Sequence, residues 1–437
     1  MHEIQALEIF LGCELQTAAS LAAQDEMRRP VPGHASHKLA MINALVRCNQ
    51  EIRRPAVKQD NKAKQNRGNQ ISAEAPQGTF DLGRRRWRVQ REGLTVGLDV
   101  GDKISHYCVL DEEAEVVQRG KLKTTPAGLQ PWMEALPAST RVVLETGTHS
   151  SWISRLIEQA GPETLVAQPR KIPQIYACKR KNDRRDAEKL ARTGRLDPNS
   201  MGPIRQRSAE QQADLAVIQA RDALVRARTQ LINTVRGLVK STGERLTGCS
   251  ARSFARQAEE QIPQRLRAAL LPLLSQIAAL SEQIERYDVH VEQLAQRKYP
   301  ETELLRQVSG VGPVTSLAFV LTVADRWRFR HSRDVGPFLG LVPGQDESGE
   351  SSPQLGISKA GNGYLRRLLI GSANYILGPF GPDCELRRWG MKLSERGGKN
   401  GRQRAKVAVA RRLAVLLHKL WVSGEVYEPL PEKRAAA

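Results

Sequence analysis

The sequence predicts a mixed α/β domain followed by a long, mainly helical region. Three strand-like segments, at 94–99, 105–110 and 116–121, are separated by polar turns, as in strands joined by hairpins. Helix-like and strand-like segments then alternate up to about residue 197. From residue 207 onward almost every segment has helical periodicity.

The later elements of the α/β region follow one another regularly. A helix is expected after Thr125-Pro126, then a strand at 141–145, a helix at 150–160 and a strand at 164–168. One more helix begins near residue 183. Three hairpin-linked strands followed by alternating helices and strands suit an RNase H-like mixed sheet.

The helical region predicts an arm and a second domain. Two amphipathic stretches, Ala209 to Leu238 and Ile262 to Leu294, are typical of long antiparallel helices or a coiled coil. Such an arm serves packing or dimerisation more often than direct nucleic-acid contact. The second domain opens with a helix, the turn Gly310-Val-Gly312 and another helix, which resembles a helix-hairpin-helix. Such a turn offers N–H groups to DNA phosphate, but a glycine-rich turn can equally be only a turn.

These patterns predict five regions. They are a poorly ordered basic extension at 1–92, a sheet domain at 93–205, the helical arm at 206–300, a C-terminal domain at 301–428 and a tail at 429–437.

Composition indicates a polyanionic partner. The 437 residues include 67 Lys and Arg against 47 Asp and Glu, which gives a net charge of +20. No apolar run reaches the length of a membrane-spanning helix, so we expect no membrane association. The six cysteines form no C-x-x-C pair, which argues against zinc and disulfide scaffolds. We therefore expect a reduced cytoplasmic protein, associated with the nucleoid.

Four carboxylates stand where a sheet-based metal site needs them. Asp99 and Glu145 each end an apolar strand, while Asp183 and Asp186 are spaced three apart on one face of a helix. Mg²⁺ prefers oxygen ligands from carboxylates and from substrate phosphate. A two-metal site needs several acids, because it stabilises both the attacking and the leaving oxygen. The four acids therefore predict a divalent metal site.

A polar loop in the C-terminal domain forms a second chemical centre. Ser348 precedes a glycine, which leaves its hydroxyl accessible, and Lys359, Arg366 and Arg367 follow nearby. A serine that attacks phosphate needs a base or metal for its proton and cations for the transition state. The residues alone do not distinguish Ser348 from an ordinary loop serine.

A basic stretch follows between Arg387 and Lys419. A basic helix is usually a solvated face, yet the net charge and the adjacent Trp389 favour a surface that follows phosphates. The residues expected to contact nucleic acid here are Arg396, Lys399, Arg402 and Arg404.

Together these motifs resemble the DEDD transposases of the IS110 insertion-sequence family, from about Leu94 to Pro429. The resemblance rests on six motifs in a fixed order. They are Gly97-Leu-Asp99, Leu144-Glu-Thr-Gly147, Lys181-Asn-Asp-Arg-Arg-Asp-Ala187, Gly310-Val-Gly-Pro313, Asp346-Glu-Ser-Gly-Glu350 and Gly356-Ile-Ser-Lys-Ala-Gly-Asn362.

The resemblance implies a RuvC-like domain, a coiled-coil arm and a C-terminal transposase domain. It implies that Asp99, Glu145, Asp183 and Asp186 are the metal ligands, with Mg²⁺ as the ion. It further implies a catalytic serine that links covalently to DNA, for which Ser348 fits best and Ser358 second. Relatives often have two polar residues before that glycine, whereas here Glu347 takes the first place.

The same resemblance implies partners: double-stranded DNA, a noncoding bridge RNA that guides target choice, and further copies of the chain in a dimer or tetramer. It predicts an RNA-guided recombinase that excises and integrates a mobile element. Two alternatives remain open. One is a RuvC-like junction nuclease that uses only metal-activated water, and the other is an inactive copy that merely binds nucleic acid.

Overall fold

A computed structural model gives the structure. The residues that it describes are 92–169, 182–346, 351, 353, 355–398 and 400–430. They form two compact units, residues 92–206 and residues 207–430, and each unit is described by itself. The predicted basic extension therefore lies outside the described residues, apart from its last residue, and so does the tail from residue 431 onward.

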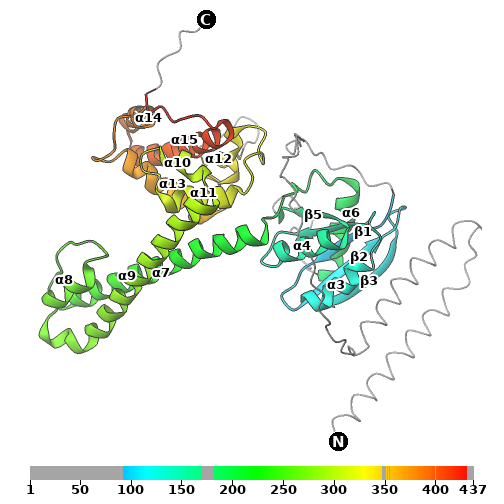
Figure 1. Ribbon diagram of the computed structural model, residues 1–437, viewed down its shortest axis with the longest axis horizontal. Helices are drawn as coiled ribbons and strands as arrows, with labels where there is room; N and C mark the ends of the chain where they lie inside the picture. The colour runs from blue at the N-terminus through cyan, green and yellow to red at the C-terminus, as the bar shows by residue number, and fades with distance from the viewer. Residues whose placement is uncertain are drawn as a thin grey trace, which may run out of the picture. The chain divides into compact units, whose positions relative to one another are not determined.

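The first unit is a mixed α/β domain built on one sheet (Figure 1). Its elements are β1 (Thr95–Asp99), β2 (Ile104–Leu110), β3 (Val116–Lys123), α3 (Pro126–Glu134), β4 (Arg141–Glu145), α4 (Ser150–Ala160), β5 (Glu163–Ala167) and α6 (Asp183–Leu196). The strand order is β3-β2-β1-β4-β5. The pairs β1–β2 and β2–β3 are antiparallel, whereas β1–β4 and β4–β5 are parallel. The predicted mixed α/β class is confirmed.

Helices cover both faces of this sheet. Strand residues alternate between the faces, so that Val142 and Leu144 pack with Trp132 of α3 and Ile153 of α4. The intervening Val143 packs instead under α6. Buried apolar residues on both faces explain why β1 and β4 are almost continuously hydrophobic in sequence.

The second unit consists of helices. They are α7 (Ala209–Ser241), α8 (Phe254–Gln261), α9 (Arg267–Lys298), α10 (Glu301–Arg306), α11 (Pro313–Val323), α12 (Val335–Phe338), α13 (Gly363–Ile376), α14 (Glu385–Glu395) and α15 (Gly401–Ser423), with 3₁₀ turns at Gln264–Leu266 and Ser332–Asp334. No helix among the described residues is both long and apolar enough to cross a membrane.

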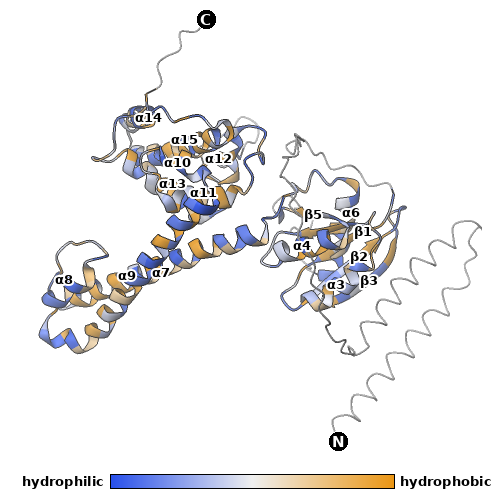
Figure 2. Cartoon of the chain, in the orientation of Figure 1, coloured by the Kyte–Doolittle hydropathy of each residue, from blue (hydrophilic) through white to orange (hydrophobic). Residues whose placement is uncertain are grey.

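Helices α7 and α9 form the arm and run in opposite directions. Asp214 accepts a hydrogen bond from Tyr299 near one end, while Arg228 donates to Ser281 farther along. Both helices show hydrophobic and hydrophilic stretches in alternation (Figure 2). One apolar cluster lies at the α8 end, and another joins the arm to the C-terminal helices. Between the two clusters the arm has polar contacts as well as the buried Ile284, and they include the ion pair of Arg221 with Asp288 at 2.5 Å.

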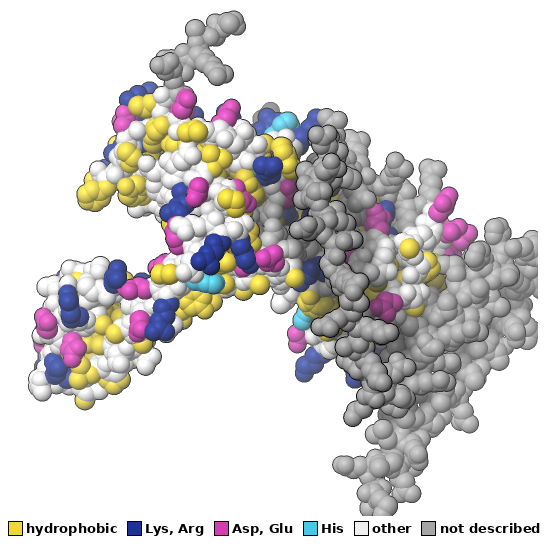
Figure 3. Space-filling model, in the orientation of Figure 1, with side chains coloured by type: hydrophobic (Ala, Val, Ile, Leu, Met, Phe, Trp, Pro, Cys, Tyr) yellow, Lys and Arg dark blue, Asp and Glu magenta, His cyan; other side chains and the backbone are white. Residues whose placement is uncertain are grey.

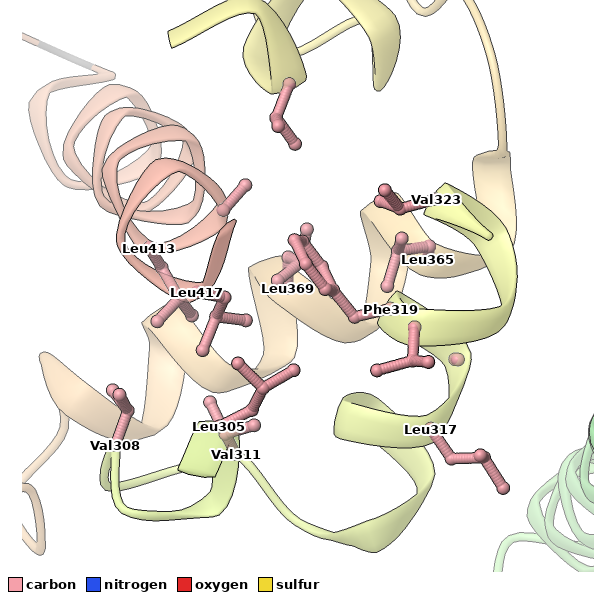
Figure 4. Packing of buried hydrophobic residues seen from close by; sticks show 14 of the residues in the cluster. Leu305, Val308, Val311, Leu317, Phe319, Val323, Leu365, Leu369, Leu413 and Leu417 are labelled. Atoms are coloured by element: carbon pink, nitrogen blue, oxygen red, sulfur yellow. The ribbon is translucent and has the colours of Figure 1, made fainter. Parts of the chain in front are cut away.

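The C-terminal helices pack around α11. Every residue of α11 from Thr315 to Val323 is buried, which is expected of a helix that is hydrophobic all round. Its Phe319 lies among leucines of α10, α13 and α15, including Leu305, Leu369 and Leu417 (Figure 4). Helices α10 and α11, with the turn at Gly310 between them, match the predicted helix–turn–helix order.

Candidate functional site

Asp99 and Glu145 lie at the same edge of the sheet. They are the last residues of β1 and β4, which are parallel neighbours with Leu98 paired to Leu144. The next pair along this register is Asp99 and Glu145, so the two residues lie side by side at the ends of adjacent strands. Both residues are half-buried.

A glycine lets α6 lie directly on β1. A Cβ added to Gly97 would lie 1.9 Å from the carbonyl oxygen of Ala187, closer than any real contact. Only glycine therefore permits this approach of helix to strand. The Gly97-Leu-Asp99 motif thus combines the residue that admits α6 with the acid that ends the strand.

Helix α6 runs antiparallel to β1 and begins at the acidic edge. Near the end of the helix, Arg195 Nη1 donates to Thr95 Oγ1 at 2.9 Å. At its start, Asp183 Oδ2 lies 3.7 Å from Nδ1 of His106, which pairs with Asp99 across β1 and β2. The first turn of α6 therefore lies beside the strand end that carries Asp99.

The two acids of α6 differ in environment. Asp186 is 4% exposed, and its Oδ2 has no hydrogen-bond partner within the described part of the chain. Its Oδ1 lies 3.6 Å from Lys189 Nζ. Asp183, by contrast, has an exposed side chain. A buried carboxylate oxygen without a donor is costly in a fold unless a cation meets it.

The donor set at this edge fits a hard divalent cation, because it consists of carboxylates and includes the buried oxygen of Asp186. Within the described ranges, however, no three His, Cys, Asp or Glu side chains converge closely enough to hold a metal ion. The structure thus brings the four acids to one edge without drawing them into a closed coordination shell. Four carboxylates repel one another, so a shell closed without a cation would be unfavourable.

Sequence reasoning missed His106. Its position follows from the hairpin, since β1 and β2 are antiparallel and pair Asp99 with His106. The predicted strand boundaries would have allowed this pairing to be inferred, but a single histidine on a strand is not part of any recognisable motif. Its contact with Asp183 makes it a neighbour of the acidic edge.

The loop with the predicted nucleophile is only partly described. Ser348 lies outside the described residues, as do the flanking positions 347, 349 and 350. Ser358 is exposed, and its N–H donates to the carbonyl oxygen of Val342 at 2.9 Å. Next to it, Lys359 adopts a left-handed φ of 53°, which favours glycine, and its side chain is exposed.

Two of the predicted phosphate-binding arginines have partners inside the fold. Arg366 Nη1 donates to the carbonyl oxygens of Leu339 and Ala360, at 2.8 and 2.7 Å. Arg367 pairs with Asp222 of α7 at 2.8 Å, although more than half of its side chain is exposed. Arg366 therefore fixes the loop before α13, a role that charge counting did not predict.

The other predicted basic residues lie around the turn between α14 and α15. Arg396, Arg402 and Arg404 are exposed there, and Lys399 lies outside the described residues. The turn depends on Gly397 and Gly398, whose φ values are +80° and +86°. Elsewhere in the unit, on the face shown in Figure 3, Lys and Arg side chains lie interspersed with Asp and Glu along the arm.

Comparison with known proteins identifies the family. Residues 96–243 match the family model for DEDD transposases of the IS110 type, described as "Transposase", and residues 302–379 match the one described as "Transposase IS116/IS110/IS902 family". The chain belongs to the IS110 family of transposases. It is therefore an enzyme that acts on DNA.

Curated relatives extend the match over most of the chain. A transposase for insertion sequence element IS1111A from Coxiella burnetii is 29% identical over 359 residues, which cover 80% of this chain and 96% of the relative. A probable family 20 transposase from Pseudomonas aeruginosa is 29% identical and covers 76% of this chain and 98% of its own length. A transposase for element IS1328 from Yersinia enterocolitica is 28% identical over 64% of this chain and 83% of its own.

Proposed function

We propose that this IS110-family transposase excises and integrates its element by a covalent serine mechanism assisted by a divalent metal. In this proposal residues 92–206 are an RNase H-like, RuvC-like catalytic domain. The proposal is supported chiefly by the position of the four acids, which all belong to elements that end or begin at one edge of the sheet. Asp99 and Glu145 end paired parallel strands, and α6 brings Asp183 and the buried oxygen of Asp186 to the same end.

The four acids hold the metal, with Mg²⁺ as the expected ion. A divalent cation bound there supplies a Lewis acid that polarises the scissile phosphate. Asp186 suits a ligand role best, since its Oδ2 is buried and has no donor among the described residues. Asp183 is exposed at the start of α6, so its carboxylate would be accessible to a metal ion that also binds a DNA phosphate.

The Ser348 hydroxyl is the proposed nucleophile. Its oxygen forms a bond to phosphorus while the bond from phosphorus to a deoxyribose oxygen breaks. The serine proton passes to solvent, and the leaving deoxyribose oxygen takes up a proton from solvent to become a free hydroxyl. Because the phosphoserine ester replaces a phosphodiester, the strand can be rejoined without an external energy source. Lys359 and the exposed Arg367 are near in sequence and supply positive charge.

The proposed partners are DNA, a guide RNA and further copies of the chain. The net charge of +20 leaves a large cationic surplus for two polyanions. Exposed Arg396, Arg402 and Arg404 are proposed to contact phosphates, and the arm of α7 and α9 is proposed to serve assembly into a dimer or tetramer. A guide RNA would be held by its backbone and shape, with target choice left to base pairing.

The decisive experiment is to trap a protein–DNA adduct on labelled element-end DNA under denaturing conditions. The wild-type protein is expected to give an adduct, Ser348→Ala none, and Ser358→Ala an undiminished amount. An adduct that Ser348→Ala retains and Ser358→Ala loses would move the nucleophile to Ser358. Cleavage by Ser348→Ala at the wild-type rate, without adduct, would instead establish a nuclease that uses metal-activated water.

The proposed RNA partner has its own test. RNA that copurifies with the full chain is sequenced and searched for loops complementary to the element ends and to the target. Absence of any enriched RNA species would remove the guide from the proposal and leave the serine mechanism untouched.

A further inference from the structure

An open pocket lies where the turn between α10 and α11 meets α13. Its volume is about 550 Å³, within the range of pockets that hold small organic groups. Ser309, Gly310 and Thr315 line one side, and Ser372 and Tyr375 line the other. The wall thus combines small polar residues, one aromatic ring and the aliphatic side chains of Val308, Val311 and Leu368.

Glycines keep this pocket open and bring an aromatic ring to it. A Cβ added to Gly312 or Gly371 would meet nothing within 4 Å, so both border free space. Gly310 has a φ of +85°, and a Cβ there would lie 3.0 Å from the Tyr375 ring. The ring rests against the turn on one side while the residue remains 46% exposed.

A second aromatic residue, Phe380, lies five residues after Tyr375 in the sequence, in the loop that follows α13. Its side chain is 84% exposed, the most exposed of the large hydrophobic residues in the described part of the chain. Its loop is held in place, because Arg387 Nη1 donates to the carbonyl oxygens of Ile376 and Gly378 at 2.5 and 2.6 Å. Gly381 also packs too closely against the Ile376 carbonyl to admit a Cβ. Because this loop is held in place, the phenyl ring of Phe380 stays exposed to water, and its hydration is unfavourable in the free protein.

Two guanidinium groups border the pocket. Arg306 pairs with Glu292 and Arg367 with Asp222, at 2.6 and 2.8 Å. A guanidinium has five N–H donors, so each can bind a phosphate oxygen in addition to its carboxylate. Aromatic rings beside arginines are the usual means by which proteins hold unpaired bases.

We infer that this pocket takes an unpaired base of the DNA, stacked on Tyr375, with Phe380 inserted beside it as a wedge. The inference rests on the proposed function, since strand exchange is the step that exposes unpaired bases. It assigns Tyr375 and Phe380 to the recognition of opened DNA, separate from the acids and the serine that perform the chemistry. Fully paired DNA has no free base to offer and does not engage the pocket.

The test compares binding of the full chain to a duplex with one bulged 2-aminopurine and to the matching paired duplex. Stacking on Tyr375 should quench 2-aminopurine fluorescence. Tyr375→Ala and Phe380→Ala should each weaken binding of the bulged duplex about tenfold, the size seen when stacking residues are removed from single-strand-binding proteins. Paired-duplex affinity should stay within twofold, and Tyr375→Phe should retain both affinity and quenching.

Trp327→Ala is the matched control, because Trp327 is 48% exposed in the same unit and lies outside the pocket. Phe380→Ala removes an exposed ring, so its folding is not at risk. Equal effects on bulged and paired DNA, or no effect on either, would overturn the inference. A preference that appears only with bulged RNA would overturn it as well. Failure of the proposed function would give a different result: the wild-type protein itself would bind neither duplex, or would form no adduct with DNA.

Discussion

The acidic edge of the sheet and the basic residues of the C-terminal unit were both predicted from sequence, yet they differ in how firmly the chain places them. Strand register alone sets Asp99 beside Glu145. Long arginine side chains have no such constraint, and Arg366 bonds to carbonyl groups of its own unit. The positions of short acidic side chains at strand ends can therefore be predicted from sequence. The binding partner of an arginine cannot, because it depends on loop conformations that the sequence pattern does not reveal.

The largest expected effect is on catalysis. Asp186→Asn keeps the shape of the side chain and removes its charge, so strand cleavage of element-end DNA should fall about 1000-fold, as when a preorganised electrostatic group is lost. Glu158→Gln, an exposed carboxylate on α4, is the control and should keep the wild-type rate. A cleavage assay on purified variants with unchanged melting temperatures makes the comparison. An active Asp186→Asn protein would show that the sheet edge is only structural.

Next in size is the close packing that brings α6 to the edge. Gly97→Ala should destabilise the first unit by about 3 kcal/mol, since its methyl group meets the backbone of Ala187. Gly147→Ala is the matched change, because a Cβ there meets nothing within 4 Å. Denaturant unfolding of the full chain measures both. Equal stability of the two variants would mean that α6 is not held against β1 as described.

The basic residues should divide into two kinds. Arg366→Ala should lower stability by about 2 kcal/mol, because two carbonyl groups lose a charged donor. Arg402→Ala should leave stability within about 0.5 kcal/mol but reduce the salt dependence of DNA binding by roughly one ion. Unfolding curves and salt titrations separate the two effects. The opposite pattern would reverse the roles of these residues.

A small pH effect should come from His418 in the second unit. Burial lowers the pKa of His418, whose Nδ1 contacts the hydroxyl of Ser332. The unfolded chain then binds the proton more readily, so this group's stabilising contribution is complete above pH of about 6.5 and decreases as the pH falls below it. In His418→Gln that slope should disappear. Parallel slopes for both proteins between pH 7 and 5.5 would refute this assignment.

Most of the first unit could be predicted because its central strands are short and apolar and its turns are polar. The predicted strand at 141–145 and helix at 150–160 coincide with β4 and α4. His106 was missed, because its role comes from hairpin register and not from any motif. The pocket at Gly310 was also beyond sequence reasoning, since it depends on how α13 packs against the preceding turn.

A cation bound at the edge formed by Asp99, Glu145, Asp183 and Asp186 is the central prediction for this protein. Electron paramagnetic resonance with Mn²⁺ measures this directly on the full chain without DNA. The wild-type protein should bind Mn²⁺ in competition with Mg²⁺, and the double variant Asp99→Asn/Asp186→Asn should lose the bound ion while keeping its melting temperature. Undiminished Mn²⁺ binding by a folded double variant would contradict the account.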